Sequence, residues 1–208
     1  MRRAYPPSED SELLLECVRR HAGRPRRALE VACGTGFIAR GLLDAGSLGL
    51  AACGDISEEA ALEASSRFRG TALEPIVCDS AEPFREGAFD LVYFNPPYLP
   101  CDPGEDPELC GGGKGVEVAL EFLRSSARAL RPGGRIYALV RAEGAGDLLE
   151  EARRLGLEGG VRCSRRLFFE ELVVLEILKP LSRRRPCPSA RSPGPPCSRI
   201  LPSRASRT

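Results

Sequence analysis

The sequence lacks the long apolar run that a membrane-spanning helix requires. No stretch approaches the roughly 18 consecutive apolar residues needed to cross a bilayer. The two arginines near the N-terminus are followed by Ala4-Tyr5-Pro6-Pro7, not by the apolar segment of a signal peptide. Both absences predict an intracellular protein with no membrane partner. We expect it in the cytoplasm, or also in the nucleus if the source is eukaryotic.

The sequence is also poor in the patterns that build metal sites. It has one histidine, His21, and none of its nine cysteines forms a pair separated by two residues. Taking His21 to be remote from all of the cysteines, we predict no metal site. Because the number of cysteines is odd and several fall inside expected helices or strands, we interpret them as buried, reduced thiols. A disulfide framework does not suit a chain of this size with strong α/β patterning.

Charge is unevenly distributed along the chain. The formal net charge is +1, but residues 181–208 contain seven arginines and no acidic residue, which leaves −6 for residues 1–180. An acidic body argues against a duplex-binding face on the domain itself. We predict a single domain over 1–180, followed by a basic tail rich in Pro, Ser and Arg over 181–208 that is disordered.

Expected strands and helices alternate along the domain. Strands are predicted over 28–32, 50–53, 74–78, 88–94 and 135–140, and helices over 8–20, 37–44, 57–68, 116–130 and 146–155. An antiparallel pair over 161–169 and 172–178 closes the chain. The pattern predicts an α/β fold with a single doubly wound, mostly parallel sheet. The loop over 95–115 is long enough to be a functional lid or disordered.

The first expected strand runs into a glycine-rich turn over residues 30–36. Gly34 and Gly36 lack a Cβ, so a ligand can approach the backbone closely, and the following helix offers free N–H groups. Dinucleotide-binding folds hold a pyrophosphate in this way, but here the third glycine is missing and Glu30 would lie badly beside phosphates. A carboxylate suits a cationic ligand such as the sulfonium and amino groups of S-adenosylmethionine. The alternative is a simple tight turn.

Two further acids stand directly after expected strands. Asp55 ends the second strand and can accept hydrogen bonds from ribose hydroxyls, and Asp79 ends the third and can accept from an adenine amino group. Alternatively, Asp55 caps the next helix and Asp79 is a loop acid. Ligands in open α/β sheets bind outside the carboxyl ends of the strands, so these acids and the glycine turn are expected to converge on one site.

The fourth expected strand ends in Asn95, Pro96, Pro97 and Tyr98. The Asn95 side-chain oxygen and the Pro96 carbonyl can accept both N–H bonds of a planar amide or amino group and turn its nitrogen toward a methyl donor. Tyr98 can pack on the flat group. Catalysis would then be positioning plus acceptor alignment, with no strong base. The alternative is a proline-rich strand exit with Tyr98 covering core. Together with the glycine turn, the motif predicts an S-adenosylmethionine-dependent methyltransferase.

These motifs resemble the HemK-related glutamine-N5 protein methyltransferases of the archaeal and eukaryotic subgroup. The resemblance covers residues 5–178 and rests on the ordered segments 5–11, 30–36, 55–56, 79, 95–98, 111–115 and 166–175. It implies a class I (Rossmann-like) methyltransferase fold, and a substrate that is the glutamine of the Gly-Gly-Gln loop in a translation release factor.

The resemblance also assigns residues and a partner. It implies cofactor binding by Ser11, Glu30, Ala32, Gly34, Gly36, Asp55, Asp79, Ser80 and Asn95, and substrate binding by Asn95, Pro96, Pro97 and Tyr98. Ala32 departs from the glycine usual at that place. Relatives form a heterodimer with a small zinc-binding activator, and the third strand is a plausible edge for such a partner.

Three other functions stay open at this point. The Asn-Pro-Pro-Tyr motif also resembles that of adenine amino-group methyltransferases acting on DNA or RNA, which need a basic cleft or an added recognition domain. Eukaryotic relatives are linked to histone lysine methylation. A non-catalytic subunit that binds the cofactor for stability alone is a third possibility, which the intact Asn95–Tyr98 motif disfavours.

Overall fold

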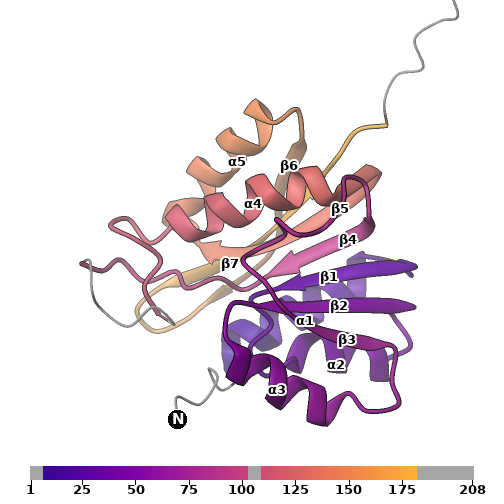
Figure 1. Cartoon of the computed structure of the whole chain (residues 1–208). Coiled ribbons are helices and arrows are strands. Elements are labelled where there is room, and N and C mark those ends of the chain that lie inside the picture. The colour runs from indigo at the N-terminus through magenta and orange to yellow at the C-terminus, as the bar shows by residue number, and fades with distance from the viewer. Residues whose placement is uncertain (1–6, 103–108, 182–208) are drawn as a thin grey trace, which may run out of the picture.

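A computed structural model describes residues 7–102 and 109–181. These residues form one seven-stranded sheet in the order β3-β2-β1-β4-β5-β7-β6, with helices on both faces (Figure 1). The strands are β1 Arg27–Val31, β2 Leu50–Asp55, β3 Leu73–Val77, β4 Phe89–Phe94, β5 Leu130–Arg141, β6 Glu158–Arg166 and β7 Glu171–Leu178. The helices are α1 Glu9–His21, α2 Phe37–Asp44, α3 Glu58–Arg67, α4 Glu117–Ala129 and α5 Ala145–Arg154, with a 3-10 turn at Ala142–Gly144.

The observed topology confirms the predicted fold class. Strands β1 to β5 pair in parallel, and β7 lies antiparallel between β5 and β6. The α1, α2 and α3 helices cover one face of the sheet, and α4 and α5 cover the other (Figure 1). As expected, β4 lies beside β1 and β3 is an edge strand. The carboxyl ends of these five parallel strands therefore meet at one edge of the sheet.

Two predicted boundaries near the C-terminus are wrong. The fifth strand starts at Leu130, because the Pro-Gly-Gly segment after α4 continues as strand with a register shift against β4. The sixth strand ends at Arg166, so Phe168 and Phe169 lie in the turn that leads to β7. The apolar Leu-Phe-Phe run extended the strand pattern in the sequence, but the Leu167 N–H donates to the Glu170 carbonyl at 2.8 Å and closes a tight turn there.

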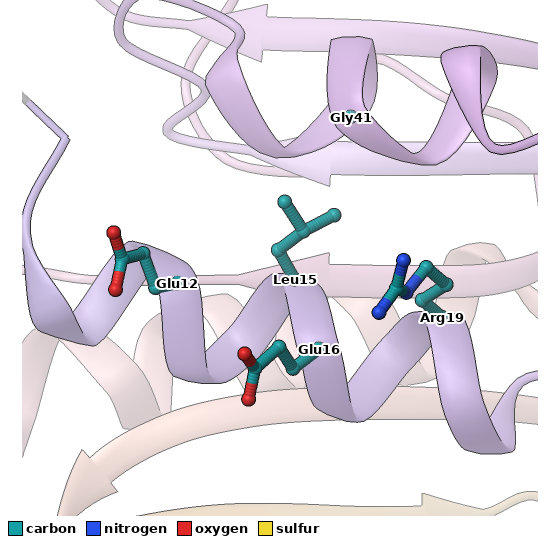
Figure 2. Close-up of a pocket in the computed structure, with 5 residues that line it drawn as sticks. All are labelled: Glu12, Leu15, Glu16, Arg19 and Gly41. Carbon is teal, nitrogen blue, oxygen red and sulfur yellow. The ribbon is translucent and has the colours of Figure 1, made fainter.

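The α1 and α2 helices approach each other closely at a glycine. A Cβ at Gly41 would lie 2.7 Å from Leu15, whose side chain points at α2 in Figure 2. A small hollow of about 360 Å³ lies at this junction. The two acids beside it, Glu12 and Glu16, are ion-paired with Arg165 of β6 at 3.7 and 3.3 Å. These ion pairs join α1 to β6 at the edge of the sheet. The hollow itself is a packing feature between α1 and α2.

The prediction that the cysteines are reduced thiols is wrong for two pairs. Disulfides join Cys17 to Cys163 and Cys101 to Cys110, whereas Cys33, Cys53 and Cys78 are free and buried as expected. The first disulfide connects α1 with β6 across 146 positions of sequence. Such a pairing depends on the tertiary packing of α1 against β6, which cysteine spacing does not reveal.

The premise used against a metal site is also wrong. His21 lies one helical turn after Cys17 on α1, and its ring nitrogen falls within 4.8 Å of the Cys17 and Cys163 sulfurs. The i, i+4 spacing on a predicted helix was the overlooked signal. In the structure the two sulfurs are bonded to each other, and the His21 Nδ1 lies 3.0 Å from the Arg162 guanidinium.

No helix in the described ranges is long and apolar enough to span a membrane. The loop after β4 folds back on itself where it is described: the Leu99 N–H donates to the Leu109 carbonyl and the Gly111 N–H to the Leu99 carbonyl. The predicted tail over 182–208 and the first part of the motif over 5–11 lie outside the described residues. The domain boundary at residue 180 stays a prediction.

Candidate functional site

The predicted site residues gather around one cavity at the carboxyl ends of β1, β2, β3 and β4. The cavity has a volume of about 730 Å³, within the usual range for small-molecule sites. Its lining includes every predicted site residue except Gly36, namely Ser11, Glu30, Ala32, Gly34, Asp55, Asp79, Ser80, Asn95, Pro96, Pro97 and Tyr98. Residues from five different segments therefore converge as the topology predicts.

Glu30 is a buried carboxylate next to the cavity. Only 3% of the residue is exposed, and its Oε2 accepts a hydrogen bond from the Ala39 N–H of α2 at 2.9 Å. Burial raises the pKa of Glu30 to about 8, although the Ala39 hydrogen bond opposes this shift. Desolvation thus disfavours the ionised form of Glu30. A cation bound in the cavity would favour the ionised form, and the two opposite charges would stabilise each other.

Asp55 organises the glycine turn as well as facing the cavity. Its Oδ2 accepts from the Gly34 N–H at 2.8 Å, and its Oδ1 accepts from the Ser57 N–H at 2.9 Å. The Ser57 side chain in turn accepts from Ala60 and caps α3, as expected from the sequence. The end of β2 therefore holds the turn that follows β1 in place.

Gly36 supports the turn by packing and does not line the cavity. It is the residue before α2, with φ of 70°, and a Cβ there would lie 2.1 Å from the Phe68 ring. Ala32 also adopts a left-handed φ, 55°, which explains why glycine is usual at that place. Gly34 has φ of 50°, and a Cβ there would meet nothing within 4 Å. All three residues thus adopt a left-handed φ, but only at Gly36 does packing against Phe68 also exclude a larger side chain.

The segment directly after β3 places an exposed acid and a residue with a strained backbone at the cavity. Asp79 is solvent-exposed, and Ser80 follows it with φ of 48°. The Cys78 thiol donates to the Ser80 carbonyl at 3.5 Å, which helps to hold this conformation. A left-handed residue other than glycine is uncommon and is often found at binding sites.

Asn95 presents a polar atom that the described residues leave unsatisfied. Its Oδ1 is buried and has no hydrogen-bond partner among residues 7–102 and 109–181. A buried acceptor without a donor costs roughly 1–3 kcal/mol, so its persistence calls for an explanation. This atom belongs to a residue of the cavity wall, and the buried Pro96 follows it.

Tyr98 is held by a residue that sequence reasoning missed. The Tyr98 hydroxyl donates to Asp10 Oδ2 at 3.2 Å, while Asp10 Oδ1 accepts from the Ser8 and Ser11 hydroxyls at 2.7 and 3.1 Å. Asp10 is only 2% exposed. From the sequence alone, Asp10 is one of three acids in the first turn of α1, where the helix dipole favours negative charge. Its membership of the conspicuous 5–11 motif was the signal available.

The glycines over 111–115 explain how the Asn95–Tyr98 segment is covered. A Cβ at Gly111 would lie 2.6 Å from the Pro97 carbonyl, and one at Gly115 would lie 2.4 Å from the Tyr98 carbonyl. Only glycine lets this stretch approach so closely. The glycine-rich stretch is therefore a packing partner of the Asn-Pro-Pro-Tyr motif.

The cavity suits S-adenosylmethionine in its chemistry. It has a buried carboxylate at Glu30 and acids after β2 and β3, together with apolar wall residues such as Phe37, Ile56 and Phe122. A ligand with two cationic groups, hydroxyls and an aromatic base finds complementary groups in this set.

Comparisons with known proteins agree with this geometry. The family model described as "Methyltransferase small domain" matches residues 8–152. Methyltransferase HEMK2 of Mus musculus is 30% identical over 195 residues, covering 86% of this chain and 91% of that protein. A release factor glutamine methyltransferase of Deinococcus radiodurans is 32% identical over 173 residues, covering 77% of this chain and 62% of that one.

A solved structure gives the same result for the fold. The E. cuniculi Mtq2-Trm112 complex, described as responsible for methylation of the eRF1 translation termination factor, matches with a TM-score of 0.71 and 24% identity. The match covers 85% of this chain and 98% of that one. The chain therefore belongs to the methyltransferase small domain family, as an S-adenosylmethionine-dependent methyltransferase of the HemK-related group.

Proposed function

We propose that this enzyme methylates the side-chain amide nitrogen of the glutamine in the Gly-Gly-Gln loop of a class I translation release factor. The observation that carries the proposal is the buried Oδ1 of Asn95, which has no hydrogen-bond partner in the part of the chain that the structure describes and fits a planar N–H donor. The names of the D. radiodurans relative and of the E. cuniculi complex support the same substrate class. Such a substrate agrees with the predicted cytoplasmic location.

An amide nitrogen is a poor nucleophile because its lone pair is delocalised into the carbonyl. Asn95 Oδ1 and the Pro96 carbonyl would accept its two N–H bonds, which fixes the plane of the amide and directs the nitrogen toward the cofactor. Tyr98, held by Asp10, would pack against the flat group. S-adenosylmethionine supplies an electrophilic methyl group. As the nitrogen–carbon bond forms, the sulfur–methyl bond would break, S-adenosylhomocysteine would leave with the bonding electron pair, and the nitrogen would lose one proton to solvent. Alignment rather than a strong base would then provide catalysis.

The cofactor side of the cavity divides the remaining roles. Glu30 would stabilise the cationic part of the cofactor, and Asp55 would accept from the ribose hydroxyls. Asp79 and Ser80 would contact the adenine, while Ser11 and the Ala32–Gly34 backbone would line the methionine part. Gly36 would act indirectly, through the shape of the turn.

The direct test is transfer of label from S-adenosylmethionine to the cognate release factor. A factor whose loop glutamine is changed to alanine serves as the matched control. Label on the wild-type factor alone would support both the substrate and the residue. Equal label on both factors would contradict the glutamine. No label on either, with an adenine oligonucleotide or a histone labelled in parallel, would favour one of the alternative substrates.

We also propose that a small zinc-binding activator protein pairs with the β3 edge. The strand is terminal in the sheet, and its apolar Val77 is 54% exposed. An added strand would satisfy the edge and cover this side chain. Val77→Lys should abolish co-purification with the activator without reducing cofactor affinity. Retained co-purification would place the partner elsewhere.

A further inference from the structure

The turn between β6 and β7 lies at the same edge of the sheet as the cavity. Strand β7 is antiparallel to both β5 and β6, so β6 runs in the direction of β5 and ends at the carboxyl edge. Figure 1 shows this turn at the side of the molecule where the loop after β4 also lies. Glu170, the last residue of the turn, lines the cavity together with Leu99 and Leu109.

Two aromatic side chains at this turn point into solvent. Phe168 and Phe169 are each 92% exposed, more than any other large hydrophobic residue in the described ranges. Their rings contact each other edge to face, with centroids 4.6 Å apart. A single exposed apolar residue is ordinary, but two adjacent phenylalanines, 92% exposed and directly before the cavity-lining Glu170, form a small exposed apolar surface.

The turn is held firmly enough to present these rings at a defined place. Leu167, like Tyr98, packs against the hydrophobic core on the α1, α2 and α3 side of the sheet. The Leu167 N–H donates to the Glu170 carbonyl at 2.8 Å, and the Glu170 carboxylate is ion-paired with Arg141 at 3.3 Å. The residues on both sides of the pair are therefore tied to the sheet and the cavity wall. The rings project from an anchored base.

We propose that Phe168 and Phe169 are an anchor for the folded body of the protein substrate. This inference rests on the proposed function: when the reactive loop enters the cavity, the surface of the release factor beside that loop must lie over the rim. Leu99 and Leu109, which line the cavity together with Glu170, are themselves 40% and 41% exposed. An apolar depression beside the loop is the surface that would receive them. Aromatic side chains at such places carry much of the binding energy of protein interfaces.

The anchor predicts a split between two substrates of the same chemistry. A full-length release factor can contact the rings, whereas a short peptide carrying only the Gly-Gly-Gln loop enters the cavity without reaching them. The double variant Phe168→Ala/Phe169→Ala should raise KM for the full-length factor by about tenfold or more with kcat unchanged. Its KM for the peptide and its affinity for S-adenosylmethionine should stay within about twofold of wild type.

Two control variants separate anchoring from folding. Val161→Ala removes an exposed apolar side chain of β6, 57% exposed and outside the cavity lining, and should leave the kinetics of both substrates unaffected. Phe168→Leu/Phe169→Leu keeps apolar surface and should recover part of the lost affinity. Equal losses for factor and peptide would overturn the anchor and assign the turn to the cavity itself.

The outcomes also distinguish this inference from the proposed function. If wild type labels the factor and the double variant has the same KM, the anchor is overturned and the function stands. If the wild-type enzyme fails to label the factor, the proposed function is contradicted. The release factor is then also excluded as the partner of the two rings. Weakened oligonucleotide binding in the double variant, with factor kinetics unchanged, would overturn the protein anchor in favour of base stacking on the rings.

Discussion

The two sides of the cavity differ in how fully their polar groups are satisfied within the chain. On the cofactor side, Glu30 accepts from Ala39 and Asp55 accepts from Gly34 and Ser57, so the turn is shaped before any ligand binds. On the substrate side, the Asn95 oxygen is buried with no partner among the described residues, and the nearby rim exposes Phe168 and Phe169. We infer that the first side is pre-organised for the cofactor and that the second is completed by the substrate.

This difference follows from what each ligand contributes. A small cofactor used in every cycle is bound best by a rigid site, because little ordering is needed when it enters. A protein substrate brings its own hydrogen-bond donors and its own apolar surface. Substitutions on the two sides should therefore separate into effects on stability and cofactor affinity, and effects on turnover and substrate affinity.

The largest effect is expected at Asn95. Asn95→Ala removes the acceptor that aligns the substrate amide, and kcat should fall by about 10²- to 10³-fold, as for the loss of other pre-organised hydrogen-bonding groups. Affinity for S-adenosylmethionine should change little, because the cofactor side keeps its own contacts. Single-turnover kinetics and calorimetric titration measure the two quantities. A large loss of cofactor affinity with normal turnover would contradict the assignment of Asn95 to the substrate side of the cavity and would assign it to the cofactor side.

Gly36 and Gly34 form a matched pair on the cofactor side. Gly36→Ala would bring a Cβ against the Phe68 ring at φ 70°, and should cost about 3 kcal/mol of unfolding free energy. Gly34→Ala meets nothing within 4 Å, so only the left-handed φ is penalised, by about 1–2 kcal/mol. Urea denaturation of both variants measures the difference. Equal losses would show that packing against Phe68 is not what requires Gly36.

Glu30 should make stability fall as pH rises. Its pKa in the folded protein is raised from 4.5 to about 8, so between these values the folded state holds a proton that the unfolded chain has released. The unfolding free energy therefore declines with pH across this window, by up to about 1.4 kcal/mol per pH unit from this group. Glu30→Gln should remove that contribution, as urea denaturation between about pH 5 and pH 9 would measure.

The same group should give cofactor binding the opposite pH dependence. A cationic ligand favours ionised Glu30, so affinity for S-adenosylmethionine should rise with pH until about pH 8 and then level off. Glu30→Gln should bind weakly without that rise. Glu74→Gln, at an exposed carboxylate on β3 outside the cavity lining, is the matched control. An unchanged pH profile in Glu30→Gln would assign the titration to another group.

The features that were predictable share one property: each depends on neighbours in the sequence. Asp55 and Asn95 stand directly after apolar strands, and the topology rule for parallel sheets then places them together. Asp10 was missed because its role depends on Tyr98, 88 positions later, and the Cys17–Cys163 disulfide because it joins α1 to β6. The turn at Phe168 and Phe169 was taken for strand, since apolar character alone does not say whether a residue faces the core or solvent.

The smallest effect is expected at Ala32, where the cofactor side carries an avoidable strain. Its φ of 55° is one that glycine adopts freely, and relief of about 1–2 kcal/mol from Ala32→Gly is offset by roughly 0.5–1 kcal/mol of added unfolded-chain entropy. We expect a net gain between about 0 and about 1.5 kcal/mol, measurable as a small rise in Tm. Ala45→Gly, at an exposed residue with an ordinary φ of −76°, has no strain to release and should lose stability. If both variants lost stability equally, the backbone at Ala32 would not be strained. The shape of the turn on the cofactor side would then require no conformational strain.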